Sequence, residues 1–358
     1  MRISYFITPH GFGHAARAAA IIEALHGLAP RIEFELFTQV PEWFFDDSLT
    51  CPFIYHALPT DIGLVQETPF AADLEQTLKR LHDFYPLGRE SINRLAAMLK
   101  KGQSELVVCD IAAMGIVAAK KAGIPCLLVE NFTWDWIYEA YAPEHPAFSK
   151  HIDYLKSVFA RVDYHFQTQP VCRPCRADLT SSPVSRKPRT PASQTRKNLG
   201  LGSGGRIVLV TTGGIPFRLP SLESIQGPRG VFFLVPSAAE IPEIRGSAIL
   251  LPHRSRFFHP DLVATADAVV GKTGYSTLAE VYWAGVPFGY VSRWNFRESG
   301  PLGAFIDHHM AGMTVSEATL SDGSWILKAH ELLSMEHRRP AGVNGADQIA
   351  AAILQILG

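Results

Sequence analysis

Two histidines close to the N-terminus stand where a catalytic base would be useful. The loop TPHGFGH, residues 8–14, follows an apolar run and precedes an alanine-rich segment that is typical of a helix. His14 therefore stands at a helix start, where the helix dipole disfavours an imidazolium ion and leaves a ring nitrogen able to accept a proton. Asp110 follows the apolar run 106–109 and can hold the imidazole in one tautomer. Both are candidate catalytic residues.

The same residues have a simpler interpretation. His10 and His14 can be turn and capping residues, and Asp110 can cap the next helix, because such side chains hydrogen-bond nearby backbone groups. Spacing alone supports the two interpretations equally. Gly11, Gly13 and His10 lie in the same loop and are candidate binding residues.

A second segment has the pattern of a phosphate-binding loop. GKTGYST, residues 271–277, follows an apolar run and leads into a helical pattern that Gly285 and Pro287 end. Glycines let the backbone approach an anion, and the free N–H groups of a helix start bind phosphate. Glu280, in the first turns of this helix, can then accept both ribose hydroxyls. The candidates for binding a nucleotide here are Lys272, Thr273, Gly274, Tyr275, Ser276, Thr277 and Glu280.

This segment also has an alternative interpretation. Ser276 and Thr277 can simply cap the helix, with Glu280 on its solvated face. The spacing is not that of a phosphoryl-transferring P-loop, which needs Gly-Lys-Ser/Thr after four variable residues. A second glycine turn, Gly213-Gly214, follows the first apolar run of the same half and should reach the same sheet edge, which strengthens the phosphate-binding interpretation.

Apolar runs bounded by turns recur along the chain, with helical stretches between them. Such runs suit parallel strands covered by helices on both sides, so an α/β protein with a doubly wound sheet in each half is expected. The runs are 3–8, 33–37, 106–109, 126–129, 207–211, 231–235, 248–251, 268–270 and 288–291. A helix over 345–357 is expected to pack against one of the lobes.

A chain of 358 residues exceeds the usual size of a single core, which favours two domains. The segment 176–205 is dense in Pro, Ser, Thr, Arg and Lys, and this composition is typical of a linker. We therefore expect Rossmann-like domains over 1–175 and 206–340, and a C-terminal helical segment over 341–358.

Composition excludes several classes of function. A formal net charge of −1 argues against a nucleic-acid partner. Pro9 interrupts the N-terminal apolar run too early for a secretory leader or a membrane span, so a cytoplasmic protein without an integral membrane segment is expected. Of the five cysteines, Cys172 and Cys175 form a CxxC pair, but no second ligand pair stands at zinc-finger spacing, so no metal is expected.

Three blocks together resemble the GT-B glycosyltransferase superfamily and, within it, the glycosyltransferase-like N-terminal domain of plant L-arabinokinases. They are YFITPHGFGHAARAAAIIEAL (5–25), LVVCDIAAMGIVAAKKAGIPCLLVENFTWDWIYEAY (106–141) and ADAVVGKTGYSTLAEVYWAGVPFGYVSRWNFRESGPLGAFI (266–306). The resemblance implies two Rossmann-like domains facing across a cleft. It places an acceptor on the N-terminal domain and a nucleotide sugar on the C-terminal domain, without a bound metal.

The resemblance also suggests roles for single residues. Glu280 matches the ribose-binding glutamate of the pattern E-x-x-x-A-G-x-P, His14 matches a general base, and Asp110 looks like its orienting partner. A related N-acetylglucosaminyl transferase contacts its donor sugar through a Gln-Gln pair where this chain has Arg297 and Glu298. Those two residues are expected to contact the donor sugar, whose identity this departure leaves open.

The leading hypothesis is an inverting, metal-independent glycosyltransferase that uses a nucleotide-diphosphate sugar, expected to be UDP-linked, and no cofactor. The candidate acceptor contacts are His10, Asn131, Trp134 and Trp136, although such an aromatic cluster is also typical of lobe packing. Gly11 and Gly13 are candidates for binding the nucleotide sugar, as are the residues of the segment 272–280 named above. A nucleotide-sugar-binding protein without turnover and a nucleotide-sugar 2-epimerase are the alternatives. The acceptor and the oligomeric state stay open, as does a peripheral position at a membrane, because related enzymes act on lipid-linked acceptors.

Overall fold

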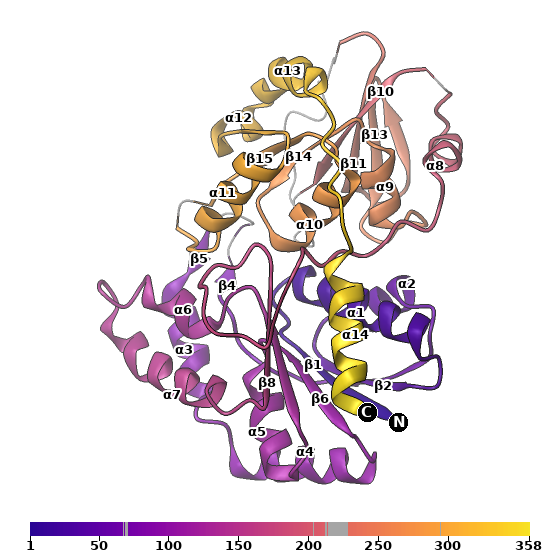
Figure 1. Ribbon diagram of the computed structural model, residues 1–358. Helices are drawn as coiled ribbons and strands as arrows, with labels where there is room; N and C mark the ends of the chain where they lie inside the picture. The colour runs from indigo at the N-terminus through magenta and orange to yellow at the C-terminus, as the bar shows by residue number, and fades with distance from the viewer. Residues whose placement is uncertain (67, 69–70, 203, 212, 214–227, 294) are drawn as a thin grey trace. The chain divides into compact units, whose positions relative to one another are not determined.

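The chain forms two compact units in the computed structural model (Figure 1). The structure describes all residues except 67, 69–70, 203, 212, 214–227 and 294, so Gly214 of the second glycine turn lies outside the described residues. Unit 1 comprises Met1–Glu67, Ala72–Ser185 and Val343–Gly358, and unit 2 comprises Thr68–Ala71 and Arg186–Gly342.

Unit 1 is built on a seven-stranded parallel sheet with the order β3-β2-β1-β6-β7-β8-β9. Its strands are β1 (Arg2–Ile7), β2 (Glu33–Thr38), β3 (Phe53–Ala57), β6 (Leu106–Asp110), β7 (Cys126–Glu130), β8 (Tyr164–Thr168) and β9 (Leu179–Ser181), and β4 (Val65–Gln66) pairs with β5 (Ala72–Asp73). The strand order reverses between β1 and β6, where Ile7 lies opposite Asp110. The loops after these two strands therefore leave the sheet next to each other.

Helices connect these strands as expected for parallel neighbours. They are α1 (Gly13–Leu28), α2 (Glu42–Ser48), α3 (Leu74–Phe84), α4 (Arg89–Lys101), α5 (Ala113–Ala122), α6 (Trp134–Glu139), α7 (Ser149–Phe159) and the 3-10 helix Pro146–Phe148. The C-terminal helix α14 (Gly345–Leu357) returns to this unit and packs beside α1 (Figure 1). The helix predicted from periodicity over 345–357 is therefore present with those bounds.

Unit 2 repeats the architecture with the strand order β12-β13-β11-β10-β14-β15-β16, in which β12 alone is antiparallel to its neighbour. The strands are β10 (Arg206–Thr211), β11 (Val231–Ala239), β12 (Glu243–Arg245), β13 (Ala248–Pro252), β14 (Ala268–Lys272), β15 (Phe288–Val291) and β16 (Gly312–Thr314). The helices are α8 (Ala192–Asn198), α9 (His259–Thr265), α10 (Tyr275–Ala284), α11 (Ser299–His309), α12 (Glu317–Asp322), α13 (Ala329–Ser334) and the 3-10 helix Ser324–Lys328. Here the order reverses between β10 and β14, so both glycine loops start at that point.

All nine predicted apolar runs form strands, which confirms the doubly wound sheet in each half. The segment 176–205, expected to be a linker, is divided between the units at Ser185–Arg186 and contains β9 and α8. The N-terminal part of this segment forms β9, which pairs with β8. The composition gave no sign of this strand, because β9 is only three residues long.

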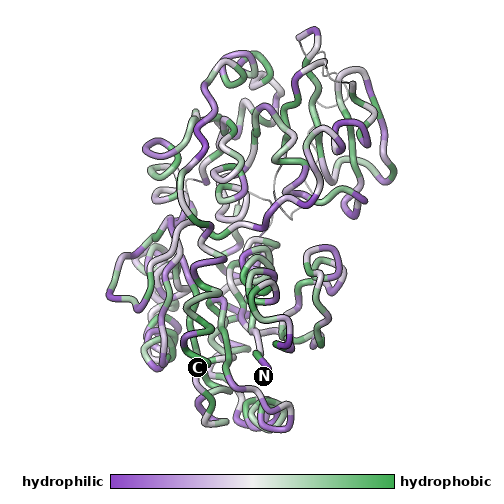
Figure 2. Tube along the Cα trace, turned by 45° about the vertical axis from the view of Figure 1, so that its right-hand side comes forward, coloured by the Kyte–Doolittle hydropathy of each residue, from purple (hydrophilic) through white to green (hydrophobic). Residues whose placement is uncertain are grey.

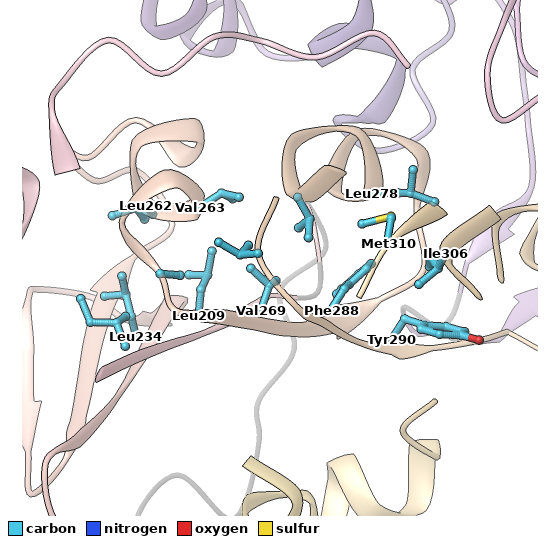
Figure 3. Packing of buried hydrophobic residues seen from close by; sticks show 14 of the residues in the cluster. Leu209, Leu234, Leu262, Val263, Val269, Leu278, Phe288, Tyr290, Ile306 and Met310 are labelled. Carbon is cyan, nitrogen blue, oxygen red and sulfur yellow. The ribbon is translucent and has the colours of Figure 1, made fainter. Parts of the chain in front are cut away.

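The strands of each sheet carry apolar side chains on both faces, and hydrophobic residues concentrate along the strands while many loops are hydrophilic (Figure 2). On one face of the unit 2 sheet, Leu209, Val269 and Phe288 come from three neighbouring strands and pack beneath Leu262 of α9 and Leu278 of α10 (Figure 3). This packing anchors the starts of both helices to the ends of the strands. Among the helices of the described residues, none combines the length and the apolar character that spanning a bilayer requires.

The close approach of β10 and β14 depends on one glycine. A Cβ added at Gly271 would lie 2.0 Å from the backbone oxygen of Thr211. Gly271→Ala should therefore destabilise unit 2 by about 3 kcal/mol or more, because the strands must separate to relieve the clash. Thermal or denaturant unfolding measures the loss. The control is Gly204→Ala, whose added Cβ meets nothing within 4 Å; equal stability of the two variants would contradict the prediction.

Candidate functional site

The structure brings His14 and Asp110 together at the carboxyl edge of the unit 1 sheet. His14 Nδ1 lies 2.8 Å from Asp110 Oδ1, and the two side chains are 9% and 0% exposed. His14 is the second residue of α1, as the sequence predicted, and Asp110 ends the neighbouring strand β6. A carboxylate only accepts hydrogen bonds, so Nδ1 donates to it and Nε2 keeps the lone pair. The pair thus has the arrangement of a general base with an orienting carboxylate.

A third residue of this cluster, Arg17, was not predicted. Its side chain is 1% exposed, and its Nε and Nη2 each donate to one oxygen of Asp110 at 2.7 Å. Its Nη1 donates to Asn131 Oδ1 at 2.6 Å. Burial raises the pKa of Asp110, but the Arg17 charge and the hydrogen bonds from Arg17 and His14 outweigh it, so the net effect lowers that pKa. Asp110 is therefore ionised and paired in the interior.

The predicted acceptor contacts differ in their accessibility. Asn131 and Trp134 are 0% exposed and Trp136 is 6% exposed, which fits the packing interpretation of this aromatic segment. The ring of Trp134 stacks with Tyr138 and meets the His10 ring edge-on at 5.0 Å. His10 is only partly buried. Contact between these residues and an acceptor stays a prediction, with His10 the most accessible of the four.

In unit 2, α10 begins at Tyr275 after Gly274, and among the described residues no side chain caps its first turn. Ser276 and Thr277 lie inside the helix, so the alternative in which they cap it is wrong. Thr273 is buried, and both its backbone N–H and its hydroxyl donate to the carbonyl of Val291, which ties β14 to β15. The start of α10 is thus held rigidly beside the end of the sheet, in the geometry that binds phosphate.

Gly213 of the second glycine turn follows β10 on the same edge of the unit 2 sheet. Its φ of +74° is a conformation that only glycine adopts readily. Its backbone N–H donates to the hydroxyl of Thr211 at 3.2 Å, which stabilises the turn. In unit 1, Gly11 has φ +65° and Gly13 is the first residue of α1.

Glu280 is buried, so the alternative that places it on a solvated helix face is wrong. Its side chain is 3% exposed, and Oε1 accepts from Nε and Nη2 of Arg186 at 3.0 and 2.8 Å. Oε2 lies 2.6 Å from Nδ1 of His259. Burial raises the pKa of Glu280, but Arg186 and His259 outweigh it and lower the pKa overall. At least three of roughly four acceptor positions on the carboxylate are filled, which leaves room for at most one ribose hydroxyl rather than the two predicted.

Lys272 ends β14 as a partly buried cation, and the described residues give its ammonium no hydrogen bond. Burial and then the nearby Arg293 lower the pKa of Lys272 to about 7, while Glu298 acts in the opposite direction. Arg293 and Glu298 are each 6% exposed, with Nη2 and Oε2 3.5 Å apart, and Arg297 is exposed. Two cations thus share one carboxylate here, and the excess positive charge suits an anionic ligand.

The CxxC loop contributes one cluster of metal-ligating residue types among the described residues: Glu130, His165 and Cys175. His165 Nε2 lies 2.9 Å from Glu130 Oε1, and its Nδ1 lies 3.9 Å from Cys175 Sγ. The imidazole presents a different nitrogen to each neighbour, so the three residues form a hydrogen-bonded chain as they stand. The expectation that the protein binds no metal stays a prediction.

The residues missed by sequence reasoning are mainly partners of buried carboxylates. Arg17 lies three residues after His14, on the same helix face, and that spacing could have indicated it. Arg186 lies in the basic segment that was interpreted as a solvated linker. His259 carried no sequence signal. Asp61 was also missed; burial raises its pKa to about 7 against hydrogen bonds from its neighbours.

Comparison with known proteins confirms the resemblance. No family model matches the chain. The chain is 27% identical over 357 residues to the L-arabinokinase of Arabidopsis thaliana, which covers 98% of this chain and 34% of that protein. The chain therefore spans about a third of the length of the curated relative it matches.

Solved structures match over the whole chain. The glycosyltransferase SnogD of Streptomyces nogalater has a TM-score of 0.59 at 15% identity, covering 100% of this chain and 99% of that one. Arabidopsis thaliana UGT89C1, complexed with UDP, has a TM-score of 0.61 at 10% identity, covering 99% of both chains. VinC, complexed with dTDP, has a TM-score of 0.57 at 14% identity, covering 99% of this chain and 94% of that one. The chain thus has the GT-B fold of glycosyltransferases.

The lowered pKa of Lys272 leads to a prediction of how stability depends on pH. The pKa of this lysine is about 7 in the folded protein against 10.5 as the ordinary value. Below pH 7 the folded state bears the full cost of the buried charge; between these values the unfolded state binds more protons, so stability rises with pH. Lys272→Met should therefore raise the unfolding temperature most below pH 7, and the gain should shrink toward pH 10.5.

Thermal unfolding at about pH 6, 8 and 10 measures this difference. Lys328→Met, at an exposed lysine of the same unit, is the matched control and should show no such trend. An increase in unfolding temperature for Lys272→Met that is the same at every pH would show that burial of the charged ammonium does not destabilise the protein.

Proposed function

We propose that this chain, which has the GT-B fold, is a glycosyltransferase that moves a sugar from a nucleotide-diphosphate sugar to an acceptor hydroxyl. The observation that carries the proposal is the buried His14–Asp110 pair, 2.8 Å apart, at the point where the strand order of unit 1 reverses. Ligands of open α/β sheets bind at such points. The fold shared with the solved glycosyltransferases supports the proposal. The proposal includes a cytoplasmic location.

The donor is proposed to bind to unit 2. The start of α10 and Lys272 together offer backbone N–H groups and a cation at one sheet edge, beside the turn at Gly213, which suits a diphosphate. Glu280 contacts the ribose, and Arg297 and Glu298 contact the sugar. Solved neighbours hold UDP or dTDP, so a uridine or thymidine diphosphate is the proposed nucleotide, with UDP first.

The proposed reaction is a single displacement that inverts the anomeric carbon. Nε2 of His14 takes the proton of the acceptor hydroxyl while that oxygen attacks the anomeric carbon, and the bond to the nucleotide diphosphate breaks. Asp110, through Nδ1, stabilises the imidazolium that forms. The departing diphosphate gains negative charge, which the amides at Gly274 and Ser276 and the ammonium of Lys272 are placed to stabilise. Because these groups supply the charge, the proposed transfer needs no metal.

Replacing the proposed base should abolish transfer. His14→Ala should lower the rate by about a hundredfold or more, since general base catalysis contributes that much, while nucleotide binding to unit 2 stays unchanged. The purified chain is incubated with UDP-, dTDP- and GDP-sugars and candidate acceptors, and free nucleotide diphosphate and sugar products are measured. His330→Gln, at an exposed histidine of α13, is the control and should retain wild-type rates.

The products separate the proposal from its alternatives. Free nucleotide diphosphate with a glycosylated acceptor supports transfer. Binding without any product would instead indicate a nucleotide-sugar-binding protein, and an altered sugar still joined to its nucleotide would indicate an epimerase. Full transfer by His14→Ala would show that the base is another residue.

The filled carboxylate of Glu280 predicts an unusual ribose preference. With at most one acceptor position left beside Arg186 and His259, only one ribose hydroxyl can donate to it. Calorimetry with UDP, 2′-deoxy-UDP and 3′-deoxy-UDP should show about a tenfold loss of affinity for one deoxy analogue and none for the other.

Glu280→Gln should remove this discrimination, whereas Glu317→Gln, at an exposed position, should keep it. Equal losses for both analogues would mean that Arg186 or His259 leaves the carboxylate when nucleotide binds. No loss for either analogue would exclude Glu280 as the ribose contact.

A further inference from the structure

Arg17 is the most constrained side chain of the unit 1 cluster. It lies one turn after His14 on α1, and its guanidinium is fixed on three sides. Nε and Nη2 clasp Asp110 as a two-pronged pair, and Nη1 donates to Asn131 Oδ1 at 2.6 Å and to Thr168 Oγ1 at 3.4 Å. These contacts come from β6, from the residue that follows β7 and from β8, so the guanidinium has a single position in the folded unit.

Arg17 shares Asp110 with the proposed base. Asp110 Oδ1 receives both Nη2 of Arg17 at 2.7 Å and Nδ1 of His14 at 2.8 Å. Nη2 also lies 3.3 Å from Nδ1. A guanidinium has no acceptor, and Nδ1 already donates to the carboxylate, so this last contact brings two donors together. Only the tautomer with hydrogen on Nδ1 satisfies Asp110, and Nε2 is left as the basic nitrogen.

The charges of the cluster decide which form of His14 is favoured. With Arg17 present, the buried cluster is neutral when His14 is neutral and carries one positive charge when His14 is an imidazolium. Without Arg17, the cluster would carry one negative charge with neutral His14 and none with the imidazolium. Burying a net charge is costly, so Arg17 reverses the preference that Asp110 alone would impose.

Other groups around His14 do not cancel this effect. Phe132 and Trp134 flank its ring with apolar surfaces. Tyr5 of β1 is buried beside Asp110 and Arg17, and burial raises the pKa of its hydroxyl well above the ordinary value, so it stays neutral. His10, on the loop before α1, contacts the same tryptophan, and Asp61 accepts from Thr8 rather than from this cluster.

We infer that Arg17 is a positioning residue that fixes Asp110 against Nδ1 of His14 and weakens the hold of His14 on a second proton. The inference rests on the proposed function in one respect: it gives the proposed base a neutral resting form. A His–Asp pair alone would stay protonated as pH falls and could then accept no proton from a hydroxyl. With Arg17 the base stays available over a wider acidic range.

The test observes His14 directly by NMR of the full chain labelled with 13C and 15N in histidine. His14→Gln identifies the signals. Wild type should show the Nδ1–H tautomer, and Arg17→Met should move the His14 titration midpoint upward by about one pH unit or more, a tenfold change in proton affinity. Arg94→Met, at an exposed arginine of the same unit, should leave the midpoint unchanged.

Two further outcomes keep the inference falsifiable. If Arg17→Met does not fold, Arg17→Lys tests the same charge without the two-pronged geometry, and should keep the midpoint. A wild-type Nε2–H tautomer, or an Arg17→Met midpoint that stays or falls, would overturn the inference.

Activity separates this inference from the proposed function. In a transferase, the acidic limb of kcat/KM against pH should shift upward in Arg17→Met, whereas a purely structural role would lower the rate equally at every pH. A chain without transfer activity but with the NMR shift would refute the proposed function and keep the inference. Transfer activity without the NMR shift would refute the inference and keep the proposed function.

Discussion

The cost of burying an ionised carboxylate is the constraint on which both candidate sites depend. Asp110 in unit 1 and Glu280 in unit 2 are almost fully buried, and an isolated charge in such a place would be costly by several kcal/mol. Each therefore has an arginine clasping it, Arg17 or Arg186. Each also contacts one histidine nitrogen, from His14 or His259. The pairing lowers the pKa of each carboxyl group and fixes the imidazole that it holds.

The topology of the two sheets decides where these pairs lie. In each unit the strand order reverses between the first strand and a later neighbour, β1 and β6 or β10 and β14, and the following loops separate there. His14 and Asp110 follow the first pair of strands, and the turn at Gly213 and the loop before α10 follow the second. The same architectural rule therefore places the proposed general base in one unit and the proposed diphosphate site in the other.

The charge balance of the two sites differs in a way that fits the proposed substrates. The unit 1 cluster of His14, Asp110 and Arg17 is neutral and lies against aromatic rings, which suits an uncharged hydroxyl. The unit 2 edge places Lys272 and Arg293 near Glu298, and the pKa of Lys272 is lowered first by burial and then by the charge of Arg293. A bound diphosphate would supply the missing negative charge and restore the full ammonium form of that lysine.

The sequence by itself predicted nine of the strands, the start of α1, the extent of α14 and the shared sheet edge of His14 and Asp110. These features follow from local periodicity and from the rule that parallel strands end on one edge, both of which can be read from neighbouring residues. Only the tertiary structure decided that Arg17 joins the pair and that Arg186 and His259 fill the carboxylate of Glu280. Arg17 and Asp110 are 93 positions apart, and Arg186 and Glu280 are 94 apart. Charge pairing at such separations leaves no periodic signal, because folding alone brings the partners together.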